Sequence, residues 1–431
     1  MSSDAKRTDI QEAGIFLLAP KLRFPGFNEP WANDPLFKVL VEHKLKNTAG
    51  REVFSVSMGS GIVNQIEHLG RSFAASDTSH YSVGRCFDVV YTKSPLKAFP
   101  FGVVKQCKFD GEVALSPLYG VFTPISPHVG LMIESYFESP NRSQRFLSPL
   151  CQKGAKNTLQ ITNETFLSGR LPLPLASAEQ QKIAACLTSL DDLIAAQARK
   201  VDALKAHKKG LMQELFPLEG ETQPRLRFPE FKATAGWEVK KLEDLAQRGS
   251  GHTPSKGNPE YYGGGVKWIS LADSKRLDAG LISTTEIEIS AQGIKKSSAV
   301  LHAAGTVLIS RDAGVGKSAV MAVPMAVSQH FIVWICHAHL LSNWFLYYLL
   351  QKMKPIFERI ASGSTIKTIG LPFFKALHIA IPTLPEQQRI ASCLISLDDH
   401  ITAATQELDA LKTHKKGLMQ QLFPPEEALE A

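Results

Sequence analysis

Three short segments of the chain carry residues whose types and spacing could support chemistry. The first, SRDAGVGKSAV around Arg311, approaches the phosphate-binding pattern G-x-x-x-x-G-K-[ST]. Arg311 stands where the pattern requires its first glycine, and without that glycine the turn that cradles a phosphate is not expected. We therefore interpret Arg311 and Lys317 as loop residues beside DNA or solvent.

The other two segments are weaker. Asn258-Pro259-Glu260-Tyr261 resembles the N-P-P-(Y/F) loop with which amino-methyltransferases hold a target base, but Glu260 replaces the second proline. No glycine-rich turn for S-adenosylmethionine precedes it, so we interpret it as a turn. Glu238-Val239-Lys240 echoes the end of a nuclease metal motif, but a pattern this short arises by chance.

The histidines and cysteines show no metal-binding or catalytic spacing. The histidines form no H-E-x-x-H motif, and His337 and His339 alternate on a strand-like run, where packed or edge histidines are expected. None of the six cysteines forms a C-x-x-C pair, which favours buried free thiols in a reducing cytosol. We predict no catalytic residue, no metal site and no cofactor in this chain.

Basic and hydroxyl side chains recur in the loops, and they suit contacts to phosphates and base edges. The net charge of +7 agrees with a phosphate-rich partner, although a solvated surface charge is the simpler explanation for any single residue. The candidates for DNA contact are Arg71, Ser72, Arg85, Lys93, Lys105, Arg142, Arg145, Lys153, Lys156, His252, Thr253, Ser255, Lys256, Lys275, Arg276, Arg311, Lys317, Ser364, Thr365 and Lys367.

An internal repeat determines how these loops are positioned. A segment that begins with EQQ at Glu179 and ends with LFP at Pro217 returns at Glu386, without a gap, and roughly two thirds of its positions are identical. A shorter echo, LRFPGF from Leu22 and LRFPEF from Leu226, precedes each half. The chain is therefore two copies of one unit: LRFPxF, a variable body and the EQQ…LFP segment.

Each EQQ…LFP segment is predicted to be one long helix. Apolar residues recur with the 3.5-residue period of a coiled coil, if Gln197, Lys208 and Lys415 fill the polar gaps. The packing residues are Ile183, Leu187, Leu190, Ile194, Val201, Leu204, Leu211, Ile390, Leu394, Leu397, Ile401, Leu408, Leu411 and Leu418. We expect the two helices to pair antiparallel and to hold the bodies at opposite ends of a rod; the alternative is that each helix docks on its own body.

Further basic residues lie near the helix C-termini. They are His207, Lys208 and Lys209 with their copies His414, Lys415 and Lys416, and the helix dipole explains them adequately. Contacts from these residues to DNA or to a partner subunit are the alternative.

The two bodies share little sequence, but both alternate short β-rich runs with glycine- and serine-rich turns, which predicts α+β domains with largely antiparallel sheets. In body two the apolar stretch after Val323 is predicted to form a buried strand, Phe331–Cys336, and a helix, Asn343–Met353, capped by Ser342, rather than a membrane span. The predicted divisions are an N-terminal segment 1–27, body one 28–175, helix one 176–217, a linker 218–236, body two 237–382, helix two 383–424 and a tail 425–431.

The repeated EQQ(K/R)IA…LDALK.HKKGLMQ.LFP segment resembles the conserved regions of the specificity (S) subunit of Type I restriction–modification systems. Body two opens with Trp237 and GSGHTPSKGNPEYYGGGVKWI, and ISAQG and ASGSTIKTIG follow; all resemble that family's target recognition domains. In body one, GRSFAASDTSHYSVGRCFDVVYTKS and FGVVKQCKFDGEVALSPLYGVF resemble another variant of the pattern. The resemblance runs from Leu22 to Pro424.

The resemblance implies a non-catalytic subunit in which each recognition domain reads one half of a bipartite double-stranded DNA target and the helices set the gap. It implies two methyltransferase (M) subunits that methylate adenine and restriction (R) subunits that cut DNA, with S-adenosylmethionine, ATP and Mg²⁺ in those partners. A cytoplasmic protein, bound to DNA in the nucleoid, is expected. The alternatives are a stand-alone DNA methyltransferase or nuclease, and a coiled-coil adaptor without DNA contacts.

Overall fold

The computed structural model describes residues 18–153, 159–363 and 367–425. The chain divides into two compact units, which we call unit 1 (residues up to 197 and from 407) and unit 2 (residues 198–406). Two long helices, α6 (Ser177–Leu215) and α11 (Leu384–Leu422), pass from one unit into the other. Each unit therefore contains half of each long helix, and each is described by itself.

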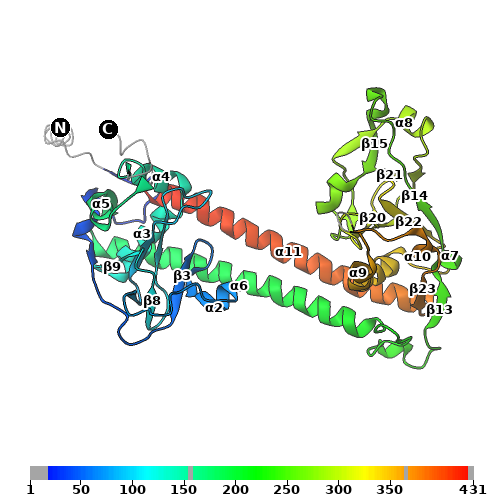
Figure 1. Ribbon diagram of the computed structural model, residues 1–431, viewed down its shortest axis with the longest axis horizontal. Coiled ribbons are helices and arrows are strands. Elements are labelled where there is room, and N and C mark those ends of the chain that lie inside the picture. The colour runs from blue at the N-terminus through cyan, green and yellow to red at the C-terminus, as the bar shows by residue number, and fades with distance from the viewer. Residues whose placement is uncertain (1–17, 154–158, 364–366, 426–431) are drawn as a thin grey trace. The chain divides into compact units, whose positions relative to one another are not determined.

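Within each unit the halves of α6 and α11 pack antiparallel, as the heptad pattern predicts (Figure 1). In unit 1, Asp191 pairs with Lys415, and six residues later Gln197 donates a hydrogen bond of 2.8 Å to Glu407. In unit 2, Lys208 pairs with Asp398. Partner numbers fall along α11 as they rise along α6, which is the signature of antiparallel pairing.

The predicted seam is the buried face of both helices. Ile183, Leu187, Val201, Ile390 and Leu394 are each at most 4% exposed. The other predicted seam positions are buried or partly buried, whereas most residues between them are exposed. The lysines at the polar gap positions have partners on the other long helix. Lys208 and Lys415 therefore form specific ion pairs, whereas the sequence explained them by the helix dipole alone.

Unit 1 contains two sheets that pack on each other and on helices. The central sheet has the order β2-β9-β6-β7, the second sheet has the order β4-β3-β8-β5, and β1 pairs with β12 beside them. The strands are β1 (Trp31–Pro35), β2 (Leu40–Glu42), β3 (Val53–Ser57), β4 (Gly61–Asn64), β5 (Ser82–Arg85), β6 (Val89–Thr92), β7 (Val103–Gln106), β8 (Glu112–Leu115), β9 (Gly120–Pro124), β10 (Gln152–Lys153), β11 (Leu159–Gln160) and β12 (Arg170–Pro174). Its shorter helices are α2 (Gln65–Leu69), α3 (Pro127–Phe137), α4 (Pro140–Leu147) and α5 (Asn163–Ser168), with the 3₁₀ turn η1 (Leu36–Lys38).

Unit 2 repeats this plan with one additional strand, β16. Its central sheet has the order β14-β22-β19-β20-β16, its second sheet β17-β15-β21-β18, and β13 pairs with β23. The strands are β13 (Glu238–Lys241), β14 (Ala246–Ser250), β15 (Tyr262–Ile269), β16 (Leu281–Ile282), β17 (Ile287–Ile289), β18 (Leu301–His302), β19 (Val307–Ser310), β20 (Ser318–Met321), β21 (Met325–Val327), β22 (Phe331–Cys336) and β23 (His378–Ile381). The helical segments are α7 (Leu242–Leu245), α8 (Ala291–Lys295), α9 (Asn343–Ile360), α10 (Leu371–Lys375), η3 (Pro229–Phe231), η4 (Pro259–Tyr261) and η5 (Leu271–Lys275).

Apart from β16 in unit 2 and the β10–β11 pair in unit 1, the described strands of the two units correspond, although their bodies share little sequence. In each second sheet the middle pair is parallel, β3 with β8 and β15 with β21, and both flanking pairs are antiparallel. In each central sheet the strand that precedes helix α3 or α9, which is β9 or β22, lies between two antiparallel neighbours. The inner strands of both central sheets, such as β6 and β19, are buried at every position, so apolar runs preserve the fold where residue identity is lost.

The predicted helix after Asn343 was too short. Ser342 caps α9 as expected, accepting a hydrogen bond from the Phe345 N–H, but the helix continues through Pro355 to Ile360. A proline inside a helix removes one backbone hydrogen bond, and the fully buried Phe357 holds the following turn against the core of unit 2. Tertiary packing thus outweighs the local break.

The segment around Arg311 is a turn between β19 and β20, so Ser318 begins a strand and not the helix that a phosphate-binding loop precedes. No helix among the described residues is both long and apolar enough to cross a membrane. The six cysteines are free thiols as predicted, but the prediction that they are buried is wrong for all except Cys107, because the others lie partly exposed. His337 and His339 lie exposed in the turn after β22 and not on the strand.

Candidate nucleic-acid interface

The loops of unit 2 that carry predicted DNA contacts meet at one end of its central sheet. β19 ends at Ser310, opposite Phe331 at the start of β22, and β14 ends at Ser250, opposite Ile332. The loop after β14, the β19–β20 turn and the approach to β22 therefore lie together. We call this end the loop edge of unit 2; it carries Thr253, Lys256, Arg311, Lys317, Gln329, His330 and Lys367.

A hydrogen-bonded cluster around Asp312 organises the loop edge. The carboxylate of Asp312 contacts His330 Nδ1 at 2.9 Å and accepts a hydrogen bond from the Thr368 hydroxyl. Arg311 Nε lies 3.7 Å from Asp312 Oδ1 and has no hydrogen-bond partner among the described residues, although this atom is buried. Three segments thus meet beside Arg311, whose side chain is 22% exposed.

The turn itself is conformationally strained. Ala313 has φ of 43°, in the left-handed region that a residue with a Cβ rarely adopts. Lys317 closes the turn by donating hydrogen bonds to the backbone and side-chain oxygens of Ser274, at 2.9 and 3.0 Å. Strain of this kind persists where the surroundings over-determine it, and it clusters at binding sites.

The loop with sequence GHTPSK is held down by aromatic side chains. Tyr262 Oη donates to the carbonyl of Pro254 at 2.6 Å, Trp268 Nε1 donates to that of His252 at 3.1 Å, and Thr253 Oγ1 donates to Gln329 Oε1 at 2.5 Å. At Gly251 a Cβ would lie 1.6 Å from the carbonyl oxygen of Val327, so only glycine permits this approach. The loop is therefore preorganised.

The corresponding end of unit 1 has the same frame and different side chains. β6 ends at Thr92, opposite Val103, and β9 begins beside it. A pocket of about 590 Å³ opens here, lined by Lys93, Ser94, Pro95, Pro117, Leu118, Ile161, Thr162 and Asn163. Leu118 is 71% exposed. We call this end the loop edge of unit 1.

Several predicted DNA contacts are engaged inside the protein. Lys105 is 4% exposed and lies 3.2 Å from Glu134 and 3.1 Å from Glu138. Arg142, also 4% exposed, donates to the carbonyls of Met419 and Gln420 at the end of α11. These two residues stabilise unit 1, and the chain does not present them to a ligand.

The remaining candidates are dispersed. Arg276 pairs with Asp273 and Glu286, the Arg71 guanidinium lies over the Phe73 ring, and Arg85 donates to the Thr123 hydroxyl. The other surface candidates are Ser72 after α2, Arg145 on α4, His252 and Ser255 on the GHTPSK loop, and Lys275 on η5. Lys156, Ser364 and Thr365 lie outside the described residues, as does the side chain of Lys153.

Sequence reasoning missed the residues that orient these loops. Asp312, Gln329 and His330 carry no motif, and they become neighbours only because β19 and β22 pair. Trp268 looked like an ordinary strand residue. The sequence offered one signal for these residues: polar side chains lie just outside the two buried apolar segments that form β19 and β22, where a sheet ends.

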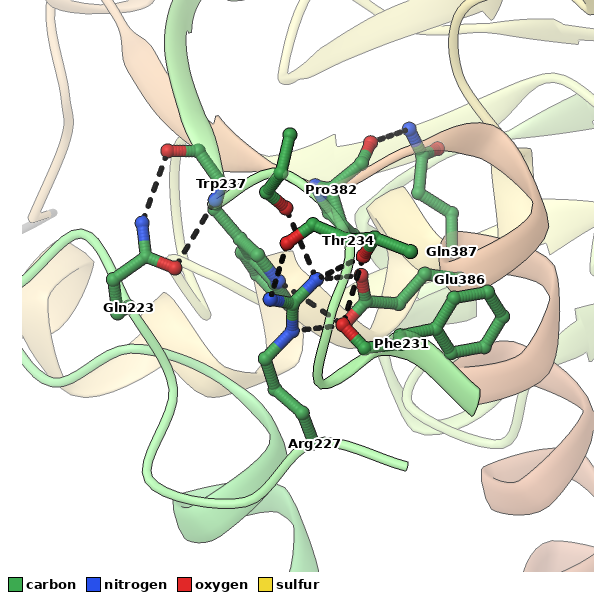
Figure 2. Close-up of polar contacts among 9 residues, drawn as sticks. Gln223, Arg227, Phe231, Thr234, Trp237, Pro382, Glu386 and Gln387 are labelled. Atoms are coloured by element: carbon green, nitrogen blue, oxygen red, sulfur yellow. Dashed lines mark hydrogen bonds and ion pairs between the residues drawn. The ribbon is translucent and has the colours of Figure 1, made fainter. Parts of the chain in front are cut away.

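The repeated motifs build a junction that occurs once in each unit. In unit 2, Arg227 of LRFP binds the carboxylate of Glu386 through two hydrogen bonds of 2.9 and 2.6 Å, and Trp237 Nε1 donates to the same carboxylate at 3.3 Å (Figure 2). Gln223 exchanges two hydrogen bonds of 3.1 Å with the backbone of Trp237. Phe216, from the LFP end of α6, packs edge-on against Trp237.

Unit 1 contains the same junction. Arg23 binds Glu179 with hydrogen bonds of 2.7 and 2.8 Å, and Trp31 Nε1 lies 3.3 Å from Glu179. Phe423 packs edge-on against Trp31. Both glutamates are 1% exposed, so each buried charge is compensated by a bidentate arginine. The EQQ, LFP and LRFP motifs thus join the start of one long helix to the end of the other.

Residues 234–413 match the family model of the Type I restriction modification DNA specificity domain. This part of the chain therefore carries the DNA specificity domain of Type I restriction–modification systems. The family and the α+β fold with two packed helices, both predicted from sequence, are confirmed.

Among its relatives, the Type I restriction enzyme MjaIX specificity subunit of Methanocaldococcus jannaschii is 32% identical over 180 residues, which cover 40% of this chain and 41% of the relative. The putative MjaX specificity subunit of the same organism is 24% identical over 69% of this chain and 68% of the relative. The alignments thus span between two fifths and about two thirds of these relatives. The solved specificity subunit from M. genitalium shares the fold, with a TM-score of 0.58 at 13% identity, over 94% of this chain and 99% of that one.

Proposed function

We propose that each unit of this specificity subunit reads one half of a bipartite double-stranded DNA target, with the loop edges as the reading surfaces. The observation that carries this proposal is the combination of one strand plan with two different loop edges. A shared frame presents loops in the same way, whereas different side chains at those loops select different bases. Two unlike half-sites are therefore expected.

The paired helices act in this proposal as a spacer of fixed length. A continuous helix rises 1.5 Å per residue, so duplicating one heptad in both α6 and α11 lengthens each by about 10 Å. Because the duplex rises 3.4 Å per base pair, the preferred gap between half-sites should grow by about three base pairs. Mapping methylated adenines in a host that carries the variant measures this gap, and an unchanged gap would refute the spacer.

Partner subunits supply the chemistry in this proposal. Two methyltransferase subunits bind the chain and carry S-adenosylmethionine, and restriction subunits add ATP- and Mg²⁺-dependent cleavage. Support for two copies of one partner comes from His207, Lys209, His414 and Lys416, which are exposed and repeat-related. Packing between helices does not require identical residues at exposed positions, so a repeated external contact explains their recurrence.

A gel-shift experiment with the methyltransferase partner tests the central claim. The complex should bind a split-site duplex in preference to scrambled DNA, and the logarithm of its affinity should fall linearly with the logarithm of salt concentration, because phosphate contacts release counterions. Binding without sequence preference would leave the adaptor alternative. Methyl transfer or cleavage by the purified chain alone would instead favour the enzyme alternative.

A further inference from the structure

Unit 2 has a cavity of about 510 Å³ beside its loop edge. Its lining includes Tyr262, Ile287 and the edge of Trp268, which is 4% exposed, and Ser328, Gln329 and His330 contribute polar groups. This volume is in the range of pockets that bind small organic ligands.

The polar groups of the cavity have unused hydrogen-bonding capacity. Ser328 is 1% exposed, and its hydroxyl is buried without a hydrogen-bond partner among the described residues. Gln329 Oε1 accepts from Thr253, which leaves its amide donors available at the mouth. His330 uses Nδ1 toward Asp312, so Nε2 remains. A buried hydroxyl without a partner is costly, and a polar ligand that bonded to it would remove that cost.

We propose that this cavity binds one unstacked nucleobase of the DNA duplex that unit 2 recognises, which rests on the proposed function. An aromatic and aliphatic wall suits the face of a base, and mixed donors and acceptors suit its hydrogen-bonding edge. Lys256, exposed at the rim, suits the phosphate that accompanies the base. Because aromatic side chains fix the GHTPSK loop, this wall is formed before DNA arrives.

The cavity can be filled without removing any of its contacts. Ala272 is an exposed lining residue on η5, and Ala272→Phe places a ring in the mouth. Ser328→Val removes only the hydroxyl and keeps the shape. Gln292→Ala, at an exposed position on α8 outside the cavity, is the matched control. Thermal unfolding of each variant establishes that it is folded.

The test uses the specificity subunit with its methyltransferase partner and split-site duplexes that carry 2-aminopurine at successive positions of the half-site read by unit 2. One position other than the adenine that the methyltransferase methylates should show a rise in fluorescence on binding that persists in Gln292→Ala and disappears in Ala272→Phe. Ala272→Phe should also weaken specific binding about tenfold, as expected for the loss of one stacked base. Ser328→Val should weaken it less.

Three other outcomes overturn the inference. An equal rise in Ala272→Phe, or no rise at any position, while the split site is still bound specifically, removes the cavity from recognition and leaves the proposed function intact. Calorimetry without duplex tests a free nucleoside monophosphate. If the complex binds it and Ala272→Phe abolishes that binding, the cavity is a site for a soluble nucleotide instead. Loss of all sequence preference in the unaltered complex refutes the proposed function itself.

Discussion

The two junctions of this protein are built from the same residues, whereas the two loop edges share almost none. Arg23, Trp31 and Glu179 repeat as Arg227, Trp237 and Glu386 with hydrogen-bond lengths that differ by at most 0.2 Å. Lys93 and Leu118 stand where Arg311 and His330 stand in the other unit. Sequence identity within this chain therefore follows the joints that hold the helices, and variation follows the surfaces that we propose to read DNA.

The largest expected effect comes from breaking a junction. Glu386→Ala leaves Arg227, whose side chain is 14% exposed, without its carboxylate. Removing one partner of a buried ion pair costs about 3–5 kcal/mol of unfolding free energy. If the junctions are equivalent, Glu179→Ala should cost the same, measured by denaturant unfolding.

The exposed pair between Arg389 and Glu230, at 49% and 47% exposure, is the control for the junction. Glu230→Ala should change the stability by less than about 1 kcal/mol, because solvent screens the pair. If Glu179→Ala lowers the free energy of unfolding much more than Glu386→Ala does, the two junctions contribute unequally to stability despite their similar hydrogen bonds.

The next effect concerns the loop edges. Arg311→Ala should cost about 1–3 kcal/mol of specific DNA binding and relax the base preference at one position of one half-site. Lys93→Ala in unit 1 should weaken binding to all sequences alike and reduce the salt slope by about one. Affinities for single-base variants of the target distinguish the two, and equal behaviour of both variants would contradict the assignment of Arg311 to a base.

A smaller difference is expected in the helix seam. Lys415 is shared by Asp191 and Glu138, whereas Lys208 pairs with Asp398 and lies over the Tyr348 ring. Lys415→Met should therefore destabilise by about 2 kcal/mol and Lys208→Met by about 1 kcal/mol.

Acid tests the same seam contact. Burial opposes the charge of Glu138, but Lys105 and Lys415 outweigh it and hold its pKa below the ordinary value. This contribution is present above the ordinary pKa of a glutamate and is lost as the pH falls through the lowered one. Lys415→Met should shift that acid loss toward higher pH in unit 1, and an unchanged profile would exclude Glu138 as its source.

The smallest expected effect distinguishes the units near neutral pH. Burial lowers the pKa of His302, whose Nε2 has no hydrogen-bond partner among the described residues. The unfolded chain then binds more protons, so the contribution of His302 to stability is present above its ordinary pKa and is lost as the pH falls below it. After correction for the intrinsic exchange rate, which itself falls with pH, the hydrogen-exchange protection of β18 should decrease from pH 7.5 to 5.5, while that of β6 in unit 1 should not. His302→Gln should remove the difference.

The comparison also shows what the sequence could predict. Ile183 and Leu187 belong to a periodic pattern, and local periodicity is enough to place a long helix and its seam. Phe331–Cys336 was predicted with the bounds of β22 because a short apolar run has few alternatives. Pro355 misled the prediction of α9, since the packing of Phe357 that overrides it involves residues distant in sequence.

The candidate site was predicted less well than the fold. Lys105 and Arg142 were chosen for their charge, and their burial depends on Glu134 and on the end of α11, which no local pattern reveals. Arg311 and Thr253 lie at the loop edge as loop composition suggests, but Asp312, His330 and Gln329 join them only through strand pairing. Whether any of these residues reaches a base is still a prediction.

One backbone contact has a consequence for how such proteins can be rearranged. The Leu226 N–H bonds to the Glu214 carbonyl at 2.9 Å, where the chain runs continuously from one to the other. The Leu22 N–H bonds to the Gln421 carbonyl at 3.0 Å in the same way, with almost the whole chain between them. An LRFP segment thus binds the end of a long helix in the same way whether or not the chain connects the two directly. A permuted polypeptide, opened at 218–225 and encoding the second half before the first, would satisfy the same set of contacts.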